Sequence, residues 1–325
     1  MIVVKNIFWA TLIVALFSFN LYAAGGESQD FNHRDKFYDI AEWQGKLWIF
    51  GYPGHIYNST DKGKTWSRVE TGENSAFFSF SAFDEKIALL SGPKGLILRT
   101  EDGGKIWKKI ETKVKVPLFG VQALKGTTHA WAVGHFNAIL HSSDKGLTWE
   151  RQIYQIPEDA EDEPGLNAIW MLSENVGWIV GEFGVILNTI DGGKNWYLKA
   201  KPINSPFYDL LFINDMQGVT VGSEGAVYLT TDGGENWNKY SPAIKFHLFS
   251  VTVVGESIRA VGQDGIFIVS EKFGDGVWKE FRVGVYTWLD SVLFLDSKTG
   301  FAVGGRGTIL STKDGGSKWE KISGR

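Results

Sequence analysis

A short motif that occurs seven times constrains the fold of this chain more than any other feature. Six copies read [Ser/Thr]-x-Asp-x-Gly-x-x-Trp, and a seventh, from Ser270 to Trp278, has Lys272 in place of the aspartate and one additional residue. The seven tryptophans are spaced 41, 42, 47, 41, 41 and 41 residues apart. Such a regular period indicates one supersecondary unit repeated in tandem, in which each unit buries its apolar face against its neighbours.

Each unit is predicted to be a meander of four short strands. In the unit from Phe207 to Tyr240, the expected strands are 207–212, 218–222, 225–230 and 237–240. They are rich in β-branched and aromatic residues, and turn residues such as Asp, Asn and Gly separate them. No stretch of the unit shows a helical period of apolar residues.

Seven such sheets in tandem predict an all-β fold, a seven-bladed β-propeller of four-stranded antiparallel meander blades spanning residues 35–325. An isolated sheet exposes unpaired backbone N–H and C=O groups along its edge strands. Arranging the sheets in a closed ring leaves only short edges of this kind. A solenoid would need atypical capping repeats, whereas the first and last units here are ordinary. We expect the ring to close by contact between the first and seventh blades, unless residues 25–35 add a strand.

The first 24 residues have a different composition. Lys5 precedes an apolar run over residues 7–21, and Ala23 and Ala24 offer small residues for cleavage. This pattern predicts a secretory signal peptide at 1–24, followed by an N-terminal segment at 25–34, with an uncleaved anchor as the alternative. The chain has no cysteine, which excludes a lipid-modified cysteine and disulfides. We therefore expect an exported protein, periplasmic or extracellular and soluble, with no membrane span after cleavage.

Composition and motifs argue against several function classes. The net charge of −4 gives no basic footprint for nucleic acid. The six histidines form no H-E-x-x-H pattern, and the chain has neither a G-x-S-x-G elbow nor a phosphate-cradling loop with its lysine. The sequence therefore predicts no catalytic residues, no cofactor and no metal site.

The repeated motif itself is predicted to be structural. Its aspartate can accept backbone N–H groups of its own turn, its glycine suits a conformation that other residues resist, and its tryptophan can pack between sheets. No single active site would need so many copies. The residues assigned to this structural role are Asp61, Trp66, Asp102, Trp107, Asp144, Trp149, Asp191, Trp196, Asp232, Trp237, Trp278, Asp314 and Trp319.

Candidate binding residues lie in the turn between the second and third strands of each unit. In a meander this turn lies on the face opposite the repeated motif, and two glycines, or a glycine and Asn137, frame it while its other residues vary. The candidates are Lys94, His135, Phe136, Glu182, Phe183, Glu224, Asp264 and Arg306. They predict a funnel mouth that is basic on blades two and seven and acidic on blades four to six. The alternative is that they are solvated turn tips.

The wider spacing between Trp149 and Trp196 places an insertion between the third and fourth units. It contains several carboxylates bracketed by Pro157 and Pro164. An acidic disordered loop is the first interpretation and a docking loop for a basic partner the second. The spacing fits no standard calcium loop.

The order of recurring residue types within each repeat unit resembles that of a known family. One example is the segment Trp178-Ile-Val-Gly-Glu-Phe-Gly-Val-Ile-Leu-Asn-Thr-Ile-Asp-Gly-Gly193, and the other units contain equivalent segments. Together, over roughly residues 35–323, they resemble the photosystem II stability/assembly factor family. The motif also matches the Asp-box, or BNR repeat, of sialidases. The resemblance implies an exported, non-catalytic seven-bladed propeller that holds an incoming membrane subunit. Photosynthetic members present an arginine-rich patch, whereas only Arg306 of this chain falls on a candidate turn.

The sequence thus predicts an exported monomeric propeller that binds a protein partner and assists the assembly or stability of a membrane or envelope complex. The alternative is a glycan-active or glycan-binding propeller. In that case Glu182 with Glu224 or Asp264 would be the carboxylate pair, because glycoside hydrolysis generally uses two carboxyl groups.

Overall fold

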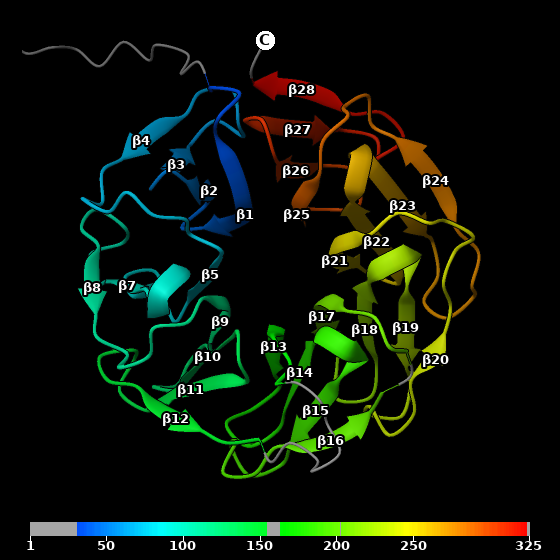
Figure 1. Ribbon diagram of the computed structural model, residues 1–325. Helices are drawn as coiled ribbons and strands as arrows, with labels where there is room; N and C mark the ends of the chain where they lie inside the picture. Colours follow the sequence, from blue (N-terminus) through cyan, green and yellow to red (C-terminus); the bar gives the residue numbers. More distant parts are fainter. Residues whose placement is uncertain (1–30, 155–162, 202, 324–325) are drawn as a thin grey trace, which may run out of the picture.

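The structure, a computed structural model, describes residues 31–154, 163–201 and 203–323. The chain forms seven four-stranded antiparallel sheets arranged in a ring, so the predicted seven-bladed β-propeller is confirmed (Figure 1). The predicted signal segment and most of the acidic insertion lie outside the described residues. The described part contains no helix with the length and apolar character needed to span a bilayer.

Each blade consists of four consecutive strands paired in chain order. The blades are β1–β4 (Lys36–Trp43, Lys46–Tyr52, Ile56–Ser59, Ser67–Val69), β5–β8 (Ser79–Ala82, Ala88–Ser91, Ile97–Thr100, Lys108–Ile110), β9–β12 (Leu118–Ala123, Ala130–Gly134, Ala138–Ser142, Glu150–Gln152), β13–β16 (Leu166–Met171, Gly177–Gly181, Ile186–Thr189, Tyr197–Ala200), β17–β20 (Phe207–Phe212, Gly218–Gly222, Val227–Thr230, Asn238–Lys239), β21–β24 (Leu248–Val254, Ser257–Gly262, Ile266–Ser270, Lys279–Arg282) and β25–β28 (Leu289–Phe294, Gly300–Gly304, Thr308–Thr312, Glu320–Ser323). Short 3-10 turns η1 (Pro93–Gly95), η2 (Glu182–Gly184), η3 (Ser223–Gly225) and η4 (Gln263–Gly265) join the second and third strands of four blades.

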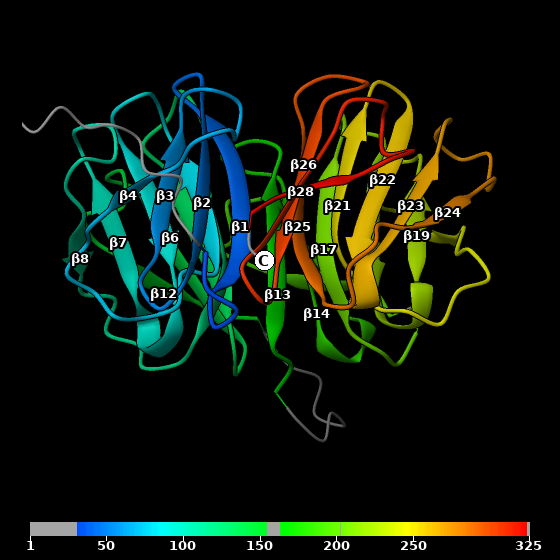
Figure 2. The ribbon, with the colours of Figure 1, turned by 90° about the horizontal axis from the view of Figure 1, so that it is seen from above.

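The first strand of every blade lies next to the axis and the fourth lies at the rim (Figure 1). Seen from the side, the strands run between two faces that carry the turns (Figure 2). Because the blades are meanders, the turns between second and third strands share one face with the blade-to-blade connections. We call this the funnel face. The Asp-box turns, between third and fourth strands, lie on the opposite face, which we call the box face.

The core consists of seven apolar clusters, each between two consecutive blades. Every cluster contains one Asp-box tryptophan. Trp107 of blade 2, for example, packs with Trp48 and Phe50 of blade 1. The second and third strands supply most of the remaining members, since both of their faces are covered by neighbouring sheets. The repeated tryptophan therefore joins one blade to the blade before it.

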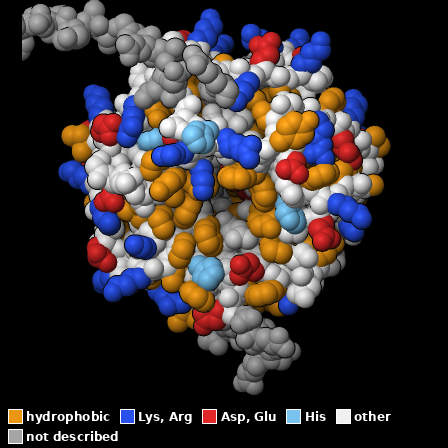
Figure 3. Space-filling model, turned by 45° about the horizontal axis from the view of Figure 1, so that its top comes forward, with side chains coloured by type: hydrophobic (Ala, Val, Ile, Leu, Met, Phe, Trp, Pro, Cys, Tyr) orange, Lys and Arg blue, Asp and Glu red, His pale blue; other side chains and the backbone are white. Residues whose placement is uncertain are grey.

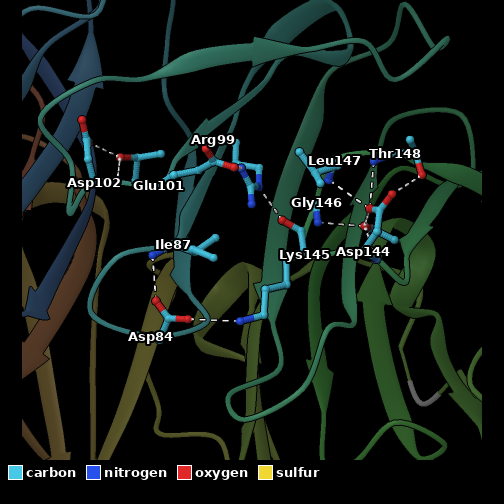
Figure 4. Close-up of polar contacts among 12 residues, drawn as sticks. Asp84, Ile87, Arg99, Glu101, Asp102, Asp144, Lys145, Gly146, Leu147 and Thr148 are labelled. Carbon is cyan, nitrogen blue, oxygen red and sulfur yellow. Dashed lines mark hydrogen bonds and ion pairs between the residues drawn. The ribbon is translucent and has the colours of Figure 1, made fainter.

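The Asp-box turn of blade 3 shows how the motif is held (Figure 4). The Asp144 carboxylate accepts the N–H groups of Leu147 and Thr148 at 3.0 and 2.9 Å. The Ser142 hydroxyl donates to Asp144 at 2.8 Å and accepts the Gly146 N–H at 2.8 Å. These bonds satisfy polar groups of the turn within the turn itself.

The same turn is tied to the preceding blade (Figure 4). Arg99 of β7 donates its Nε to the Lys145 carbonyl at 2.6 Å, and the Lys145 ammonium pairs with Asp84 at 3.3 Å. Arg99 also pairs with Glu101. The box face thus carries structural polar contacts between blades 2 and 3.

The seventh, altered copy keeps its turn with a different aspartate. Asp275, five residues after the Ser270 that begins the motif, accepts the Ser270 hydroxyl at 2.7 Å and the Val277 N–H at 2.9 Å. Trp278 donates its Nε1 to the Tyr240 carbonyl at 2.6 Å. The additional residue therefore shifts the acceptor along the chain without removing the turn.

The ring closes without a strand shared between the first and last blades. β1 lies beside β25, and Lys36 forms an isolated bridge with Gly305. The Gly307 N–H donates to the Asp35 carbonyl at 2.8 Å. Phe31 and Trp66 pack into one cluster with residues of blade 7. In the described part, the N-terminal segment closes the seam by packing rather than by adding a strand.

Replacing Trp66 by alanine is expected to lower the free energy of unfolding by about 3–5 kcal/mol, since it empties the apolar seam between blades 7 and 1. Urea unfolding followed by tryptophan fluorescence measures this. The matched control is Ile106→Ala, on an Asp-box turn with 60% of its surface exposed, which should change the free energy by less than about 0.5 kcal/mol. Equal effects of the two changes would contradict closure by packing.

Gly95, the second glycine of the funnel-face turn in blade 2, is required by both conformation and space. At Gly95 the φ angle is +72°, and an added Cβ would overlap the Val114 carbonyl oxygen. The Gly95 N–H also donates to the Val116 carbonyl at 2.7 Å, which holds the turn against the connection to blade 3. We expect Gly95→Ala to cost about 3 kcal/mol or more.

Gly126 provides the control for this change. Its φ is +80°, but no other atom lies within 4 Å of the Cβ position. Gly126→Ala should therefore cost only the backbone strain of about 1–2 kcal/mol. Thermal and urea unfolding of the two variants separate the contribution of close packing from that of conformation, and similar losses would argue against the close approach.

Candidate functional site

The site is built from a bulge in the innermost strand of nearly every blade. In β1, Phe37 pairs with Gly51 and Asp39 with Phe50, so Tyr38 is left between them without a partner in the register. The glycine permits this, since a Cβ at Gly51 would overlap the Lys36 carbonyl oxygen. β9, β13, β17, β21 and β25 have the same irregularity at the equivalent place. A bulge re-aims the side chain of its extra residue, and here that residue faces the channel.

The bulged residues, with Phe78 just before β5, form a ring that we call the collar. Its members are Tyr38, Phe78, Phe119, Asn167, Tyr208, Phe249 and Asp290, one from each blade, and all are partly buried. They line the central cavity, whose volume is about 640 Å³. Hydrophobic side chains gather around the central hollow on this side of the molecule (Figure 3).

The aromatic members of the collar contact one another in two arcs. The Tyr38 and Phe78 rings meet edge to face with centroids 5.3 Å apart, and Phe78 lies 5.9 Å from Phe119. On the other side of the channel, Tyr208 and Phe249 are 5.3 Å apart. Such contacts fix the ring orientations. The collar is therefore a preformed apolar surface.

Next to the collar, the following residue of each innermost strand forms a second ring, the belt. Its members are Asp39, Ser79, Gly120, Ala168, Asp209, Ser250 and Ser291. The polar ones accept an N–H from the next blade. Asp39 binds Phe80 at 2.8 Å, Asp209 binds Val251 at 2.9 Å, and Ser291 binds Ile40 at 3.4 Å across the seam. The belt thus links blades along the channel wall.

Burial in the channel wall raises the pKa of three carboxyl groups. The pKa of Asp39 rises to about 6 and that of Asp209 to about 7, although hydrogen bonds from backbone N–H groups oppose the shift in each case. The pKa of Asp290 rises to about 8, again through burial, against the Trp288 side chain and the Lys36 charge. The Oδ2 atom of Asp290 is buried and has no hydrogen-bond partner among the described residues.

The predicted binding residues all lie on the funnel face, outside the collar. Six of them have left-handed φ angles between 53° and 57°, which makes the turns tight hairpins with two consecutive left-handed residues. The six are Lys94, Phe136, Phe183, Glu224, Asp264 and Arg306, and all are exposed. His135 lies beside Phe136, with ring centroids 4.1 Å apart, and reaches Phe119 of the collar at 6.3 Å.

The structure brings only some of these predicted residues together. Asp264 and Arg306 line one cavity of about 350 Å³ between blades 6 and 7. Glu182 accepts the Gly165 N–H at 2.7 Å, so its carboxylate is engaged within its own blade. Neither Glu182 nor Glu224 lines the central cavity or the cavity between blades 6 and 7. The carboxyl groups that face the channel are Asp39, Asp209 and Asp290.

The binding residues predicted from the sequence include no member of the collar. The signal was present, because an aromatic ring precedes the belt residue in five of the seven units. Within residues 31–154, 163–201 and 203–323, no group of three or more His, Asp and Glu side chains is placed to hold a metal ion.

The structure is a seven-bladed propeller with an aromatic collar around its channel, and comparisons with known proteins agree on the propeller fold. Residues 118–200, which span blades 3 and 4, match the family described as photosynthesis system II assembly factor YCF48. The resemblance predicted from the sequence is thereby confirmed. No curated protein matches this sequence.

Solved structures share the fold at low sequence identity. One described as YCF48 bound to D1 peptide is 20% identical with a TM-score of 0.69, covering 89% of this chain and 96% of that one. YCF48 from Cyanidioschyzon merolae is 18% identical with a TM-score of 0.70, covering 87% and 97%. The GH74 enzyme of Niastella koreensis is 15% identical with a TM-score of 0.75, covering 91% of this chain but 56% of that one.

Replacing Asp290 by asparagine is expected to change how stability depends on pH. The folded pKa, about 8, lies above the ordinary value of 3.8, so the unfolded chain releases this proton first as pH rises. The stabilising contribution of the carboxyl is complete below about pH 4, is lost progressively up to about pH 8, and then levels off. The wild type should therefore lose stability relative to Asp290→Asn across this window, as measured by urea unfolding at each pH.

Asp61→Asn provides a control of opposite sign. Hydrogen bonding from the Thr65 N–H, above all, lowers the pKa of Asp61 to about 2. Its contribution is present above about pH 4 and is lost as the pH falls toward 2. Parallel pH curves for the wild type and Asp290→Asn would contradict the assignment.

Proposed function

We propose that this chain is an exported, non-catalytic propeller that binds a segment of a protein partner over the collar and assists the assembly or stability of a membrane or envelope complex. The collar is the observation that carries the proposal. An aromatic surface that is partly exposed around a hollow is typical of interaction sites, and Tyr is enriched among residues that dominate interface energies.

The family resemblance supports a protein ligand. The YCF48 structure in complex with a D1 peptide shows that a propeller of this fold can hold a peptide in that protein. For this chain, export rests on the apolar segment at its start, and the membrane complex rests on the family. A monomer is sufficient, since the cavity is lined by one copy of the chain.

The roles of two of the three channel carboxylates, Asp39 and Asp209, support binding rather than catalysis. Asp39 accepts N–H groups of its own and the next blade and the Ser291 hydroxyl. Asp209 likewise accepts from Leu210 and Val251. Because both hold the ring together, neither is available as a general acid or base without loss of these bonds.

Crosslinking in the cell envelope followed by mass spectrometry tests the proposal. The wild type should capture a reproducible partner, and a variant with Phe119→Ala and Phe249→Ala should capture at least about tenfold less, as expected when interface anchors are truncated. The control carries Leu147→Ala and Ile190→Ala, which remove exposed apolar side chains from the box face. Capture should survive in the control.

Both variants are first checked for wild-type circular dichroism, so that a loss of capture reports binding rather than folding. The proposal fails if no partner is recovered reproducibly, or if the collar variant captures the same proteins as the wild type.

A further inference from the structure

The cavity between blades 6 and 7 adjoins the collar on the funnel face. It is lined by Phe249, Gln263, Asp264, Tyr286, Thr287, Trp288 and Arg306 and has a volume of about 350 Å³. Phe249 belongs to its wall and to that of the central channel. A ligand lying over the collar can therefore extend directly into this second cavity, which we call the side pocket.

The side pocket presents one unpaired charge of each sign. Among the described residues, neither the Asp264 carboxylate nor the Arg306 guanidinium takes part in a hydrogen bond or an ion pair. The backbone at Asp264 is held, because Arg282 donates to its carbonyl at 3.0 Å while stacking 3.8 Å above the Phe246 ring. The turn is thus fixed and its carboxylate is left for a ligand.

The aromatic wall of the side pocket is unusually exposed. Tyr286 has 88% of its surface exposed and Trp288 has 37%. Between them, the Thr287 hydroxyl is buried and has no partner among the described residues. Trp, Tyr and Arg are the residue types that most often supply the binding energy of protein interfaces, and all three meet here.

The side pocket also lies at a boundary of charge on the funnel face. Glu182, Glu224 and Asp264 occupy the turns of blades 4 to 6, whereas Arg306, Lys36 and Lys94 follow on blades 7, 1 and 2. A ligand that crosses the pocket meets a negative wall and then a positive one. Charge complementarity across an interface selects the partner and fixes its register.

We propose that the side pocket binds an extended peptide segment of the partner, with an apolar side chain on Trp288 and Tyr286, a basic side chain facing Asp264 and an acidic side chain facing Arg306. The inference rests on the proposed function and adds the chemistry of the partner segment. A neutral oligosaccharide is the competing ligand, since it can also stack on aromatic rings.

The chain itself supplies charge-reversal variants that its turns accept. Lys94 and Glu224 adopt the same left-handed conformation, with φ of 57° and 53°, as Arg306 and Asp264, with φ of 57° and 53°. Asp264→Lys and Arg306→Glu therefore introduce residue types that this turn already holds in other blades. Lys62→Glu is the matched control, because Lys62 is exposed and also left-handed, with φ of 59°, but it lies on the Asp-box turn of blade 1, on the box face.

The test uses four fluorescein-labelled octapeptides with a central leucine, flanked by Lys and Glu, by Glu and Lys, by two Lys or by two Glu, and fluorescence anisotropy with the full-length chain. One of the two mixed-charge peptides should bind the wild type about fivefold tighter than either single-sign peptide, as expected for one exposed charge pair. Asp264→Lys should shift the preference to the two-Glu peptide, and Arg306→Glu to the two-Lys peptide. Lys62→Glu should leave the wild-type order unchanged.

Two results would overturn the inference while leaving the proposed function intact. In one, the partner recovered by crosslinking is bound, but both charge reversals keep the wild-type peptide order. In the other, peptides bind with equal affinity whatever their charges. A third result would identify a glycan as the ligand in place of the peptide. In that case cello- or xylo-oligosaccharides bind the wild type, Trp288→Ala loses this binding, and no peptide binds. Failure of the proposed function itself appears separately, as the absence of any crosslinked partner.

Discussion

Apolar packing between consecutive blades is the interaction on which the rest of this structure depends. In residues 31–154, 163–201 and 203–323 no strand is shared between the last blade and the first, so the contact between blades 7 and 1 has to hold the ring shut without a shared ladder. That contact is of the same kind as the other six, with an Asp-box tryptophan in each. The stability of the closed ring therefore depends on side-chain packing repeated between blades. At the seam, the Phe31 side chain and the hydrogen bond to the Asp35 carbonyl add to this packing.

The glycine that ends the second strand determines how the frame of each blade forms the collar. Because it has no Cβ, the innermost strand can approach it closely and bulge, and the bulge turns one side chain toward the channel. The same bulge in other blades, together with Phe78, produces the collar. The neighbouring belt residue is used instead to bond to the next blade. The proposed binding surface and the contacts between blades thus use adjacent positions of one strand.

The blade count, the strand order and the position of the Asp-box turns were predictable because each depends on contacts within one repeat. The collar was not, since it depends on a register shift that becomes visible only when two strands are paired. Asp290 illustrates this. In the sequence it precedes a serine in an ordinary strand, and only the closed ring buries its Oδ2 atom without a partner. The presence of Asp264 and Arg306 in one pocket likewise depends on how neighbouring blades are oriented.

In the turns of the funnel face, side chains of different chemistry share one backbone conformation. Lysine, glutamate, aspartate, arginine and phenylalanine occupy one backbone conformation in different blades, each supported by the residue that follows it and by the connection to the next blade. A single substitution at such a site can change the charge or size of the side chain that the surface presents while leaving the frame intact. Descendants of one ancestral ring can therefore diverge toward unrelated ligands quickly, and overall likeness between them is a poor guide to what each one holds.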